Sequence, residues 1–233
     1  MKQTKSLIFI AFVALLLFSC VRENLKPEPQ PPSVPQIILD TDIGSSTDDL
    51  FAMQMLYRYA SQGRCGLLGV VVDRMGDTNA AVADLMNNYY GFPTLPIGLE
   101  RNGAYERFSY INYTPIAQAT DTNGNPLFVR TYSDYSSLPD GYVLYRCLLA
   151  NAPDGSVTIM LTGIASTIAN LLTSGADQYS PLTGVELVRR KVKQLYFMAT
   201  KLEPGSELEK KGYLSFPKGN LSIFMPDFFI PVF

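Results

Sequence analysis

Apolar runs of strand length alternate with amphipathic runs of helix length through most of this chain of 233 residues. Strands are predicted at 37–39, 66–72, 95–98, 157–161 and 192–198, and helices at 50–59, 79–90, 143–150 and after the Thr162-Gly163 turn as far as Leu172. This alternation is typical of an α/β fold with a mostly parallel, Rossmann-like sheet flanked by helices. Ligands of such sheets bind at the carboxyl ends of the strands, which is where function is expected.

The alternation is interrupted between residues 101 and 140, a polar segment rich in tyrosine. We interpret it as an insertion or long loop within a single domain that covers residues 36–233. Residues 175–190 are predicted to form a loop and a short helix before the last strand.

The N-terminus reads as a targeting signal. Lys2 and Lys5 precede an uncharged apolar run at 6–18, which ends in Leu17-Phe18-Ser19-Cys20. This ending resembles a bacterial lipobox, so we expect residues 1–19 to be a signal peptide and Cys20 to carry a lipid. Residues 20–35 are proline-rich and predict an extended tether. The expected location is the bacterial cell envelope, lipid-anchored in the outer membrane with the domain on its periplasmic or surface face. An uncleaved anchor or an ordinary signal peptide is the alternative.

The composition excludes several kinds of chemistry. The chain has no histidine, so a Ser-His-Asp or Cys-His catalytic unit and a histidine-ligated zinc or haem are excluded. Its 19 basic and 21 acidic residues create no basic field, so a nucleic-acid partner is not expected. Besides Cys20, the chain has Cys65 and Cys147, which either pair or stay as free thiols.

Four carboxylates lie within ten residues where the first strand ends and the first helix begins: Asp40, Asp42, Asp48 and Asp49. Such close negative charges repel each other, and a hard divalent cation relieves the repulsion. Carboxylates and backbone carbonyls are the ligands that Ca²⁺ and Mg²⁺ prefer. The cluster therefore predicts a divalent metal site. In the alternative, the acids are helix caps and solvated loop charges, with Thr47 or Asp48 as the N-cap.

Two segments resemble the inosine/uridine-preferring nucleoside hydrolases. Residues 36–53 (QIILDTDIGSSTDDLFAM) are similar to the family's opening strand, Asp-x-Asp, glycine turn and Asp-Asp pair. Residues 157–172 (VTIMLTGIASTIANLL) are similar to its later strand, Thr-Gly turn and helix. The resemblance covers about residues 36–198 and implies Ca²⁺-assisted hydrolysis of the N-glycosidic bond of ribonucleosides, as in purine and pyrimidine salvage.

The resemblance also implies roles for individual residues. Asp42 matches a Ca²⁺ ligand that activates the attacking water, Asp49 matches a second carboxylate ligand, and Thr162 matches a residue whose backbone carbonyl binds the metal. Asp48 matches a residue that contacts the ribose hydroxyls, and either Asp73 or Asn79 matches a further ribose contact. Asp40 matches a supporting acid. Aromatic side chains of the insertion are candidates for stacking on the base.

The sequence departs from the family after Met198. The family's late aspartate ligand and its leaving-group histidine have no counterpart, and the surroundings of Asp227 do not match the motif. Ile164 and Thr167 stand where the family usually has Pro and Asn. We therefore expect a C-terminally shortened member. Three explanations stay open: a truncated hydrolase, a non-catalytic nucleoside- or carbohydrate-binding lipoprotein, or a site that a partner subunit, such as another copy of the chain, completes.

A haloacid-dehalogenase-like phosphatase is a further alternative. The Asp40-Thr41-Asp42 segment after an apolar strand also resembles the start of those enzymes, with Thr162 and either Lys191 or Lys193 in the later roles. The Asp48-Asp49 pair has no explanation in that family, and its late acidic motif is absent from the sequence.

Overall fold

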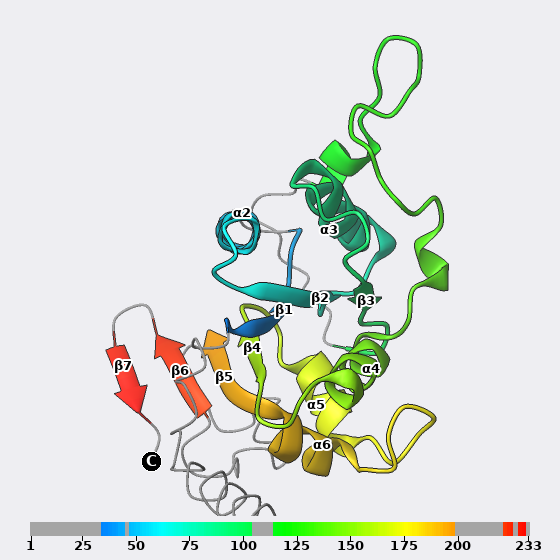
Figure 1. The fold of residues 1–233 in the computed structure, drawn as a ribbon. Coiled ribbons are helices and arrows are strands. Elements are labelled where there is room, and N and C mark those ends of the chain that lie inside the picture. Colours follow the sequence, from blue (N-terminus) through cyan, green and yellow to red (C-terminus); the bar gives the residue numbers. More distant parts are fainter. Residues whose placement is uncertain (1–33, 45–46, 104–113, 199–220, 226–227, 232–233) are drawn as a thin grey trace, which may run out of the picture. The chain divides into compact units, whose positions relative to one another are not determined.

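A seven-stranded sheet organises the chain in the order β3-β2-β1-β4-β5-β6-β7 (Figure 1). The computed structural model describes residues 34–44, 47–103, 114–198, 221–225 and 228–231. The strands are β1 (Gln36–Thr41), β2 (Gly66–Val72), β3 (Ile97–Leu99), β4 (Val157–Leu161), β5 (Val192–Met198), β6 (Leu221–Met225) and β7 (Phe228–Pro231). Each pair from β3 to β6 is parallel, and β7 pairs antiparallel with β6. The predicted α/β fold with a mostly parallel sheet is confirmed.

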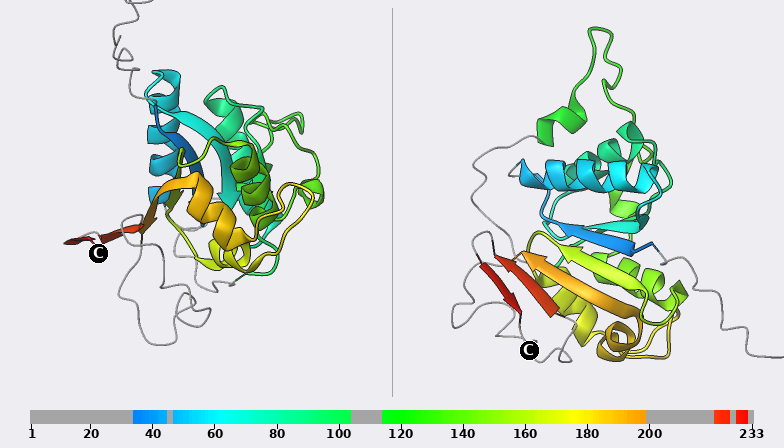
Figure 2. Two further views of the ribbon diagram at one scale, coloured as in Figure 1. Left: turned by 60° about the horizontal axis from the view of Figure 1, so that its bottom comes forward. Right: turned by 60° about the vertical axis from the view of Figure 1, so that its left-hand side comes forward.

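Helices cover both faces of the sheet, as the two views in Figure 2 show. Helices α2 (Asp48–Ser61) and α3 (Asp77–Tyr89) pack on one face. Helices α4 (Gly141–Asn151), α5 (Ser166–Thr173) and α6 (Gly184–Lys191) pack on the other. Successive side chains of a strand point to opposite faces, so Leu39 belongs to the core under α2 and α3, whereas Ile38 belongs to the core under α4 and α5. Both faces of β1 are therefore buried, which explains its uninterrupted apolar run.

The predicted strands at 66–72, 157–161 and 192–198 have those bounds in the structure. The first helix is longer than predicted, because Asp48 and Asp49 form its first turn. Thr47 is its N-cap residue, but the Thr47 side chain makes no capping hydrogen bond. Strands β6 and β7 were not predicted, and they extend the sheet beyond β5.

The strand order turns back at β1, since the chain runs outward from β1 through β2 to β3 and then returns to β4 on the other side. This is the topological switch point at which open α/β sheets bind ligands. The parallel register pairs Asp40 with Val71 of β2 and with Leu161 of β4. Residues that directly follow these three strands must therefore meet at one edge of the sheet.

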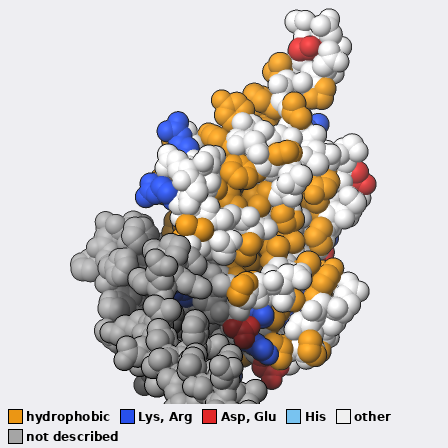
Figure 3. Space-filling view, viewed as in Figure 1, with side chains coloured by type: hydrophobic (Ala, Val, Ile, Leu, Met, Phe, Trp, Pro, Cys, Tyr) orange, Lys and Arg blue, Asp and Glu red, His pale blue; other side chains and the backbone are white. Residues whose placement is uncertain are grey.

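The described part of the insertion is fastened to α3 through one buried side chain. It contains two short 3-10 helices, η1 (Thr114–Gln118) and η2 (Tyr135–Ser137), and a projecting turn closed by a bridge between Thr120 and Pro126. The Asp84 carboxylate of α3, 1% exposed, accepts hydrogen bonds from the Thr131 and Tyr132 amides and from the Tyr135 hydroxyl. Apolar side chains are frequent on the face drawn in Figure 3, and the large exposed ones of the insertion are Ile116, Leu127 and Val129.

Residues 1–33 lie outside the described residues, and with them lie the predicted signal peptide, Cys20 and most of the tether. Within the described part of the chain, no helix has the length and apolarity that a membrane span requires. Cys65 is buried beneath α2, Cys147 is half-buried, and both are free, which agrees with the thiol alternative.

The Asp84→Ala substitution tests the anchoring of the insertion. It leaves two backbone amides and a tyrosine hydroxyl without their acceptor, and each hydrogen bond to a charged group contributes about 1.5–3 kcal/mol. We expect a loss of about 2–4 kcal/mol in the free energy of unfolding, with faster proteolysis of residues 114–137. Urea denaturation and limited proteolysis measure both. Asp134→Ala, which removes an exposed carboxylate of the same segment, is the control and should change stability far less.

Candidate active site

The residues that follow β1, β2 and β4 meet at the carboxyl edge of the sheet. We call Asp40, Asp42, Asp49, Asp73 and Thr162 the aspartate edge. The Asp73 amide donates to the Thr41 carbonyl at 3.0 Å, and the Thr162 amide donates to the Asp40 carbonyl at 2.8 Å, so the backbones of the three strands stay in register past their ends. A Cβ atom at Gly163 would lie 2.5 Å from the Asp42 amide nitrogen and from Asp73 Oδ2. Only glycine fits there, which explains the Thr-Gly turn.

Asp49 comes to this edge from the first turn of α2 and is 1% exposed. Its Oδ1 accepts hydrogen bonds from the Thr41 hydroxyl at 2.6 Å and from the Thr162 hydroxyl at 2.9 Å. Its Oδ2 is buried, and no amide or hydroxyl of the described residues donates to it. Burial raises the pKa of Asp49, while the two hydroxyl donors and a hydrogen bond with Asp42 counteract part of that rise.

Asp40 lies at the end of β1 on the face toward α4 and is fully buried. Its Oδ2 accepts a hydrogen bond of 2.6 Å from the Tyr145 hydroxyl of α4, whereas no amide or hydroxyl of the described residues donates to its Oδ1. Burial raises the pKa of Asp40 to about 7, despite hydrogen bonds with Tyr145 and Asp73. The negative charge of Glu100 adds to the rise.

Asp73 is fully buried and has another carboxyl group as its hydrogen-bond partner. Among the described residues, no amide or hydroxyl donates to its carboxylate oxygens, and it shares a hydrogen bond with the Asp40 carboxyl. Burial raises the pKa of Asp73 well above its usual range, and the charge of Asp40, that hydrogen bond and the charges of Asp42 and Asp49 raise it further. Buried charges are normally paired or bound to a metal. The aspartate edge therefore holds more buried carboxyl groups than the described side chains can stabilise in their charged form.

The oxygen-rich donor set fits a hard divalent cation. Buried carboxylate oxygens without partners on Asp40, Asp49 and Asp73 are the kind of ligand that Ca²⁺ prefers. Within the described residues, no group of three or more acidic or thiol side chains is arranged so that it could hold a metal ion, so these three carboxylates are not a complete ligand set. The ligand set expected from the sequence needs only two carboxylates, Asp42 and Asp49, with the Thr162 carbonyl and added water or sugar oxygens.

Other predicted site residues lie less centrally. Asp48 is exposed in the first turn of α2, and its charge acts on the neighbouring Asp49. The Asn79 amide donates to the Met75 carbonyl at 2.9 Å, so it closes the turn before α3. Of the two alternatives after β2, Asp73 belongs to the aspartate edge, and no described contact joins Asn79 to it. Asp227 lies outside the described residues.

The lysines that the phosphatase alternative requires lie at the wrong end of the sheet. Lys191 and Lys193 are at the amino end of β5, whereas Thr162 follows the carboxyl end of β4, and the two strands are parallel. The Lys191 ammonium donates to the Ala152 carbonyl at 2.7 Å and pairs with Asp154 at 2.9 Å. Neither lysine can therefore act beside Asp40 and Asp42.

Sequence reasoning missed two residues that contact these carboxylates. Thr41 lies inside the Asp40-Thr41-Asp42 motif. Whether its hydroxyl reaches Asp49 depends on the residue at which α2 begins. Tyr145 lies 105 residues from Asp40 on an apolar helix face, and no local pattern distinguishes it from a core tyrosine. Only the packing of α4 on β1 brings the Tyr145 hydroxyl to the Asp40 carboxylate.

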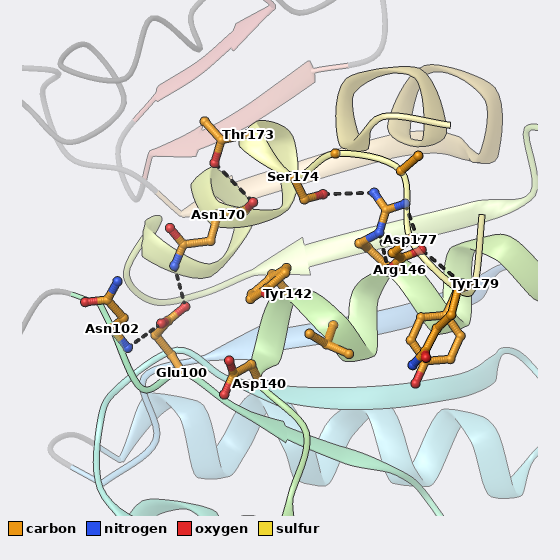
Figure 4. A pocket seen from close by; sticks show the side chains of 14 residues that line it. Glu100, Asn102, Asp140, Tyr142, Arg146, Asn170, Thr173, Ser174, Asp177 and Tyr179 are labelled. Atoms are coloured by element: carbon orange, nitrogen blue, oxygen red, sulfur yellow. Dashed lines mark hydrogen bonds and ion pairs between the residues drawn. The ribbon is translucent and has the colours of Figure 1, made fainter. Parts of the chain in front are cut away.

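A pocket of about 690 Å³ opens between α4, α5, the end of β3 and the loop after α5 (Figure 4). Glu100, 3% exposed, lies in its wall and accepts hydrogen bonds from the Asn102 amide at 2.7 Å and the Asn170 side chain at 3.0 Å. Arg146 fixes the opposite wall by binding Asp177 and the carbonyls of Ser180 and Leu182. The pocket is thus preformed, and its acidic lining disfavours anionic ligands.

Comparisons with known proteins establish the fold. No protein-family model matches the chain, and no curated protein sequence matches it. Among solved structures, the type III effector XopQ in complex with adenosine diphosphate ribose has a TM-score of 0.50 at 18% identity, covering 72% of this chain and 44% of that one. The effector XOO4466 has a TM-score of 0.52 at 17% identity, with the same coverages of 72% and 44%. These two share the fold.

Nucleoside hydrolases are also among the structural neighbours. The purine-preferring ribonucleoside hydrolase from Gardnerella vaginalis has a TM-score of 0.46 at 16% identity, covering 70% of this chain and 48% of that one. The plant nucleoside hydrolase PpNRh1 has a TM-score of 0.44 at 17% identity, covering 76% and 52%. Likenesses of this size do not establish function. The chain spans about half the length of these four proteins or less.

The Asp73→Asn substitution tests the excess of buried charge. Because the pKa values of Asp40 and Asp73 are raised by folding, the metal-free protein loses stability as pH rises from about 4 to 8. Asp73→Asn removes one buried ionisable group whose pKa folding raises, so the free energy of unfolding in EDTA should rise by about 1–2 kcal/mol at pH 7.5 and by less at pH 5. Urea denaturation at both pH values measures this. The exposed Asp154→Asn is the control, and equal stability of Asp73→Asn and wild type at pH 7.5 would contradict the prediction.

The Asp177→Asn substitution tests how the pocket wall is held. The Arg146 guanidinium, buried beside Asp177, lowers the pKa of that carboxyl, so this pair stabilises the fold above about pH 4 and less as pH falls further. At pH 7 the substitution should cost about 1–3 kcal/mol in the free energy of unfolding, and the difference from wild type should shrink at pH 3. Thermal melts across that range measure it. A difference that does not depend on pH would contradict the ion-pair explanation.

Proposed function

We propose that the aspartate edge binds Ca²⁺ and a ribonucleoside, and that the protein is a nucleoside N-ribohydrolase-like protein. The observation that carries the proposal is the set of buried carboxylate oxygens at the switch point of the sheet that accept no hydrogen bond from an amide or hydroxyl of the described residues. The resemblance of residues 36–53 and 157–172 to the hydrolases, which predicts the same edge from sequence alone, supports it. XopQ, which shares the fold, was solved with a ribosyl compound.

Asp42, Asp49 and the Thr162 carbonyl are the proposed Ca²⁺ ligands. Bound by these residues, Ca²⁺ would supply Lewis-acid chemistry that lowers the pKa of water. Asp42 would accept the proton of the water that attacks the anomeric carbon. Asp48 and Asp73 are proposed to bind the ribose hydroxyls, and the buried Asp40, held by Tyr145, supports the edge from beneath. The transition state of such glycoside cleavage is oxocarbenium-like.

The absence of histidine from the sequence predicts which substrates react. General acid catalysis typically contributes ~10²–10⁴-fold, and none of the predicted site residues is a histidine that could protonate a departing base. A leaving group that needs no protonation should therefore be favoured. We expect p-nitrophenyl riboside to be cleaved faster than inosine or uridine. The ratio of the two rates should be larger than the same ratio for a histidine-containing hydrolase.

The anchor at Cys20 completes the proposal. A lipid there, followed by the proline-rich tether, would hold the domain at the envelope membrane, where it meets nucleosides outside the cytoplasm. Metabolic labelling with a lipid analogue, compared between wild type and Cys20→Ala, tests the anchor separately from the site.

The metal site is tested with residues 20–233 purified after removal of the signal peptide. Calorimetric titration with Ca²⁺ should detect binding to the wild type, and Asp42→Ala and Asp49→Ala should abolish both that binding and ribose release from p-nitrophenyl riboside. Asp154→Ala, at the far end of β4, is the matched control and should bind Ca²⁺ as the wild type does.

Each other outcome has a defined meaning. If the wild type binds no Ca²⁺, the metal site is wrong. If it binds Ca²⁺ and ribose compounds without cleaving them, the protein is the non-catalytic binding lipoprotein. Release of phosphate from a phosphomonoester would revive the phosphatase alternative.

A further inference from the structure

The Asp49 carboxylate is held on one side only. Its Oδ1 accepts two hydroxyl hydrogen bonds, from Thr41 at 2.6 Å and from Thr162 at 2.9 Å, whereas its buried Oδ2 accepts none from an amide or hydroxyl of the described residues. Most buried carboxylate oxygens have a donor. An arrangement with two donors on one oxygen and none on the other therefore needs an explanation.

The two hydroxyls come from adjacent strands and meet a side chain from a helix. Thr41 is the last residue of β1 and is fully buried, whereas Thr162 directly follows β4. The Thr162 hydroxyl also lies 3.1 Å from the Asp40 carbonyl, which holds it close to β1. Since β1 and β4 are paired over five residues, the distance between the two donors is set by the sheet and not by a loop. Asp49 is thus fixed against a rigid surface.

We propose that Thr41 and Thr162 are positioning residues for the metal ligand Asp49, keeping Oδ2 as the oxygen that is available to the cation. The inference rests on the proposed Ca²⁺ site and extends it to two hydroxyls that do not themselves need to touch the ion. Partners that orient metal ligands typically change metal affinity by about 10–100-fold when they are removed.

The test compares Thr41→Val with Thr41→Ser in Ca²⁺ calorimetry of the residue 20–233 protein. Valine has nearly the shape of threonine but lacks the hydroxyl, so we expect affinity to fall about 10–100-fold. Serine keeps the hydroxyl, so it should restore most of the affinity. Thr162→Val, which keeps the backbone carbonyl, should weaken Ca²⁺ binding by a similar factor. If Thr41→Val fails to fold, the Ca²⁺ affinity of Thr162→Val tests the positioning role instead.

Thr167→Val is the matched control. Thr167 is fully buried on α5, and its hydroxyl has no hydrogen-bond partner, so losing that hydroxyl should leave Ca²⁺ affinity unchanged. Melting temperatures in EDTA, measured for every variant, separate positioning from folding. A purely structural role would lower the melting temperature of Thr41→Val without changing the affinity of its folded fraction.

Two failures are distinguishable. Wild-type protein that binds no Ca²⁺ overturns the proposed metal site and this inference with it. Wild-type protein that binds Ca²⁺ while Thr41→Val and Thr162→Val bind equally well overturns the positioning role alone.

Discussion

The parallel pairing of β1 with its two neighbours is the constraint on which the site depends. Because β2 and β4 flank β1 in register, the residues after all three strands meet at one edge, although Asp73 and Thr162 are far apart in sequence. The hydrogen bond from the Thr162 amide to the Asp40 carbonyl continues the ladder one residue beyond β4. Glycine at position 163 lets the next turn approach Asp42 and Asp73 without a clash. The geometry of the aspartate edge is therefore a property of the sheet.

Gathering carboxylates in this way opposes folding unless something offsets it. Tyr145 and the two threonine hydroxyls satisfy one oxygen each of Asp40 and Asp49, but Asp73 receives no amide or hydroxyl donor from the described residues and shares a hydrogen bond only with the Asp40 carboxyl. A group kept buried without compensation typically costs several kcal/mol. Natural sequences accept such costs mainly where a site needs them. For this reason, the buried carboxyl groups that lack such compensation are better evidence of a bound ligand than the number of acidic residues in the motif.

Much of the fold was predictable from the sequence because its signals are local. Apolar runs gave the bounds of β2 and β4, since strands buried largely on both faces leave little ambiguity. The bounds of β5 were also predicted, although Lys193 and Gln194 interrupt its apolar residues and Lys193 is exposed. The clustered aspartates after the first strand predicted that a site would lie where β1 ends. Three features could not be predicted, because each depends on contacts between distant segments. They are the contact of Tyr145 with Asp40, the anchoring of the insertion by Asp84 and the pairing of β6 with β5. The register after β2 was undecidable for the same reason, as only the packed sheet distinguishes Asp73 from Asn79.

The absence of histidine from the sequence bears on which steps the proposed site could catalyse. An edge rich in carboxylates can activate water and stabilise a positively charged sugar ring, and both tasks need only oxygen ligands. Protonating a departing base needs a different group. Two buried tyrosine hydroxyls already donate to carboxylates, Tyr145 to Asp40 of the aspartate edge and Tyr135 to Asp84 of α3. Burial also raises the pKa of Tyr145 well above its usual range, so its proton stays on the hydroxyl and keeps donating to Asp40. If the proposed function is correct, the arrangement would hold and polarise a ribosyl compound, and cleavage would be limited by the nature of the leaving group.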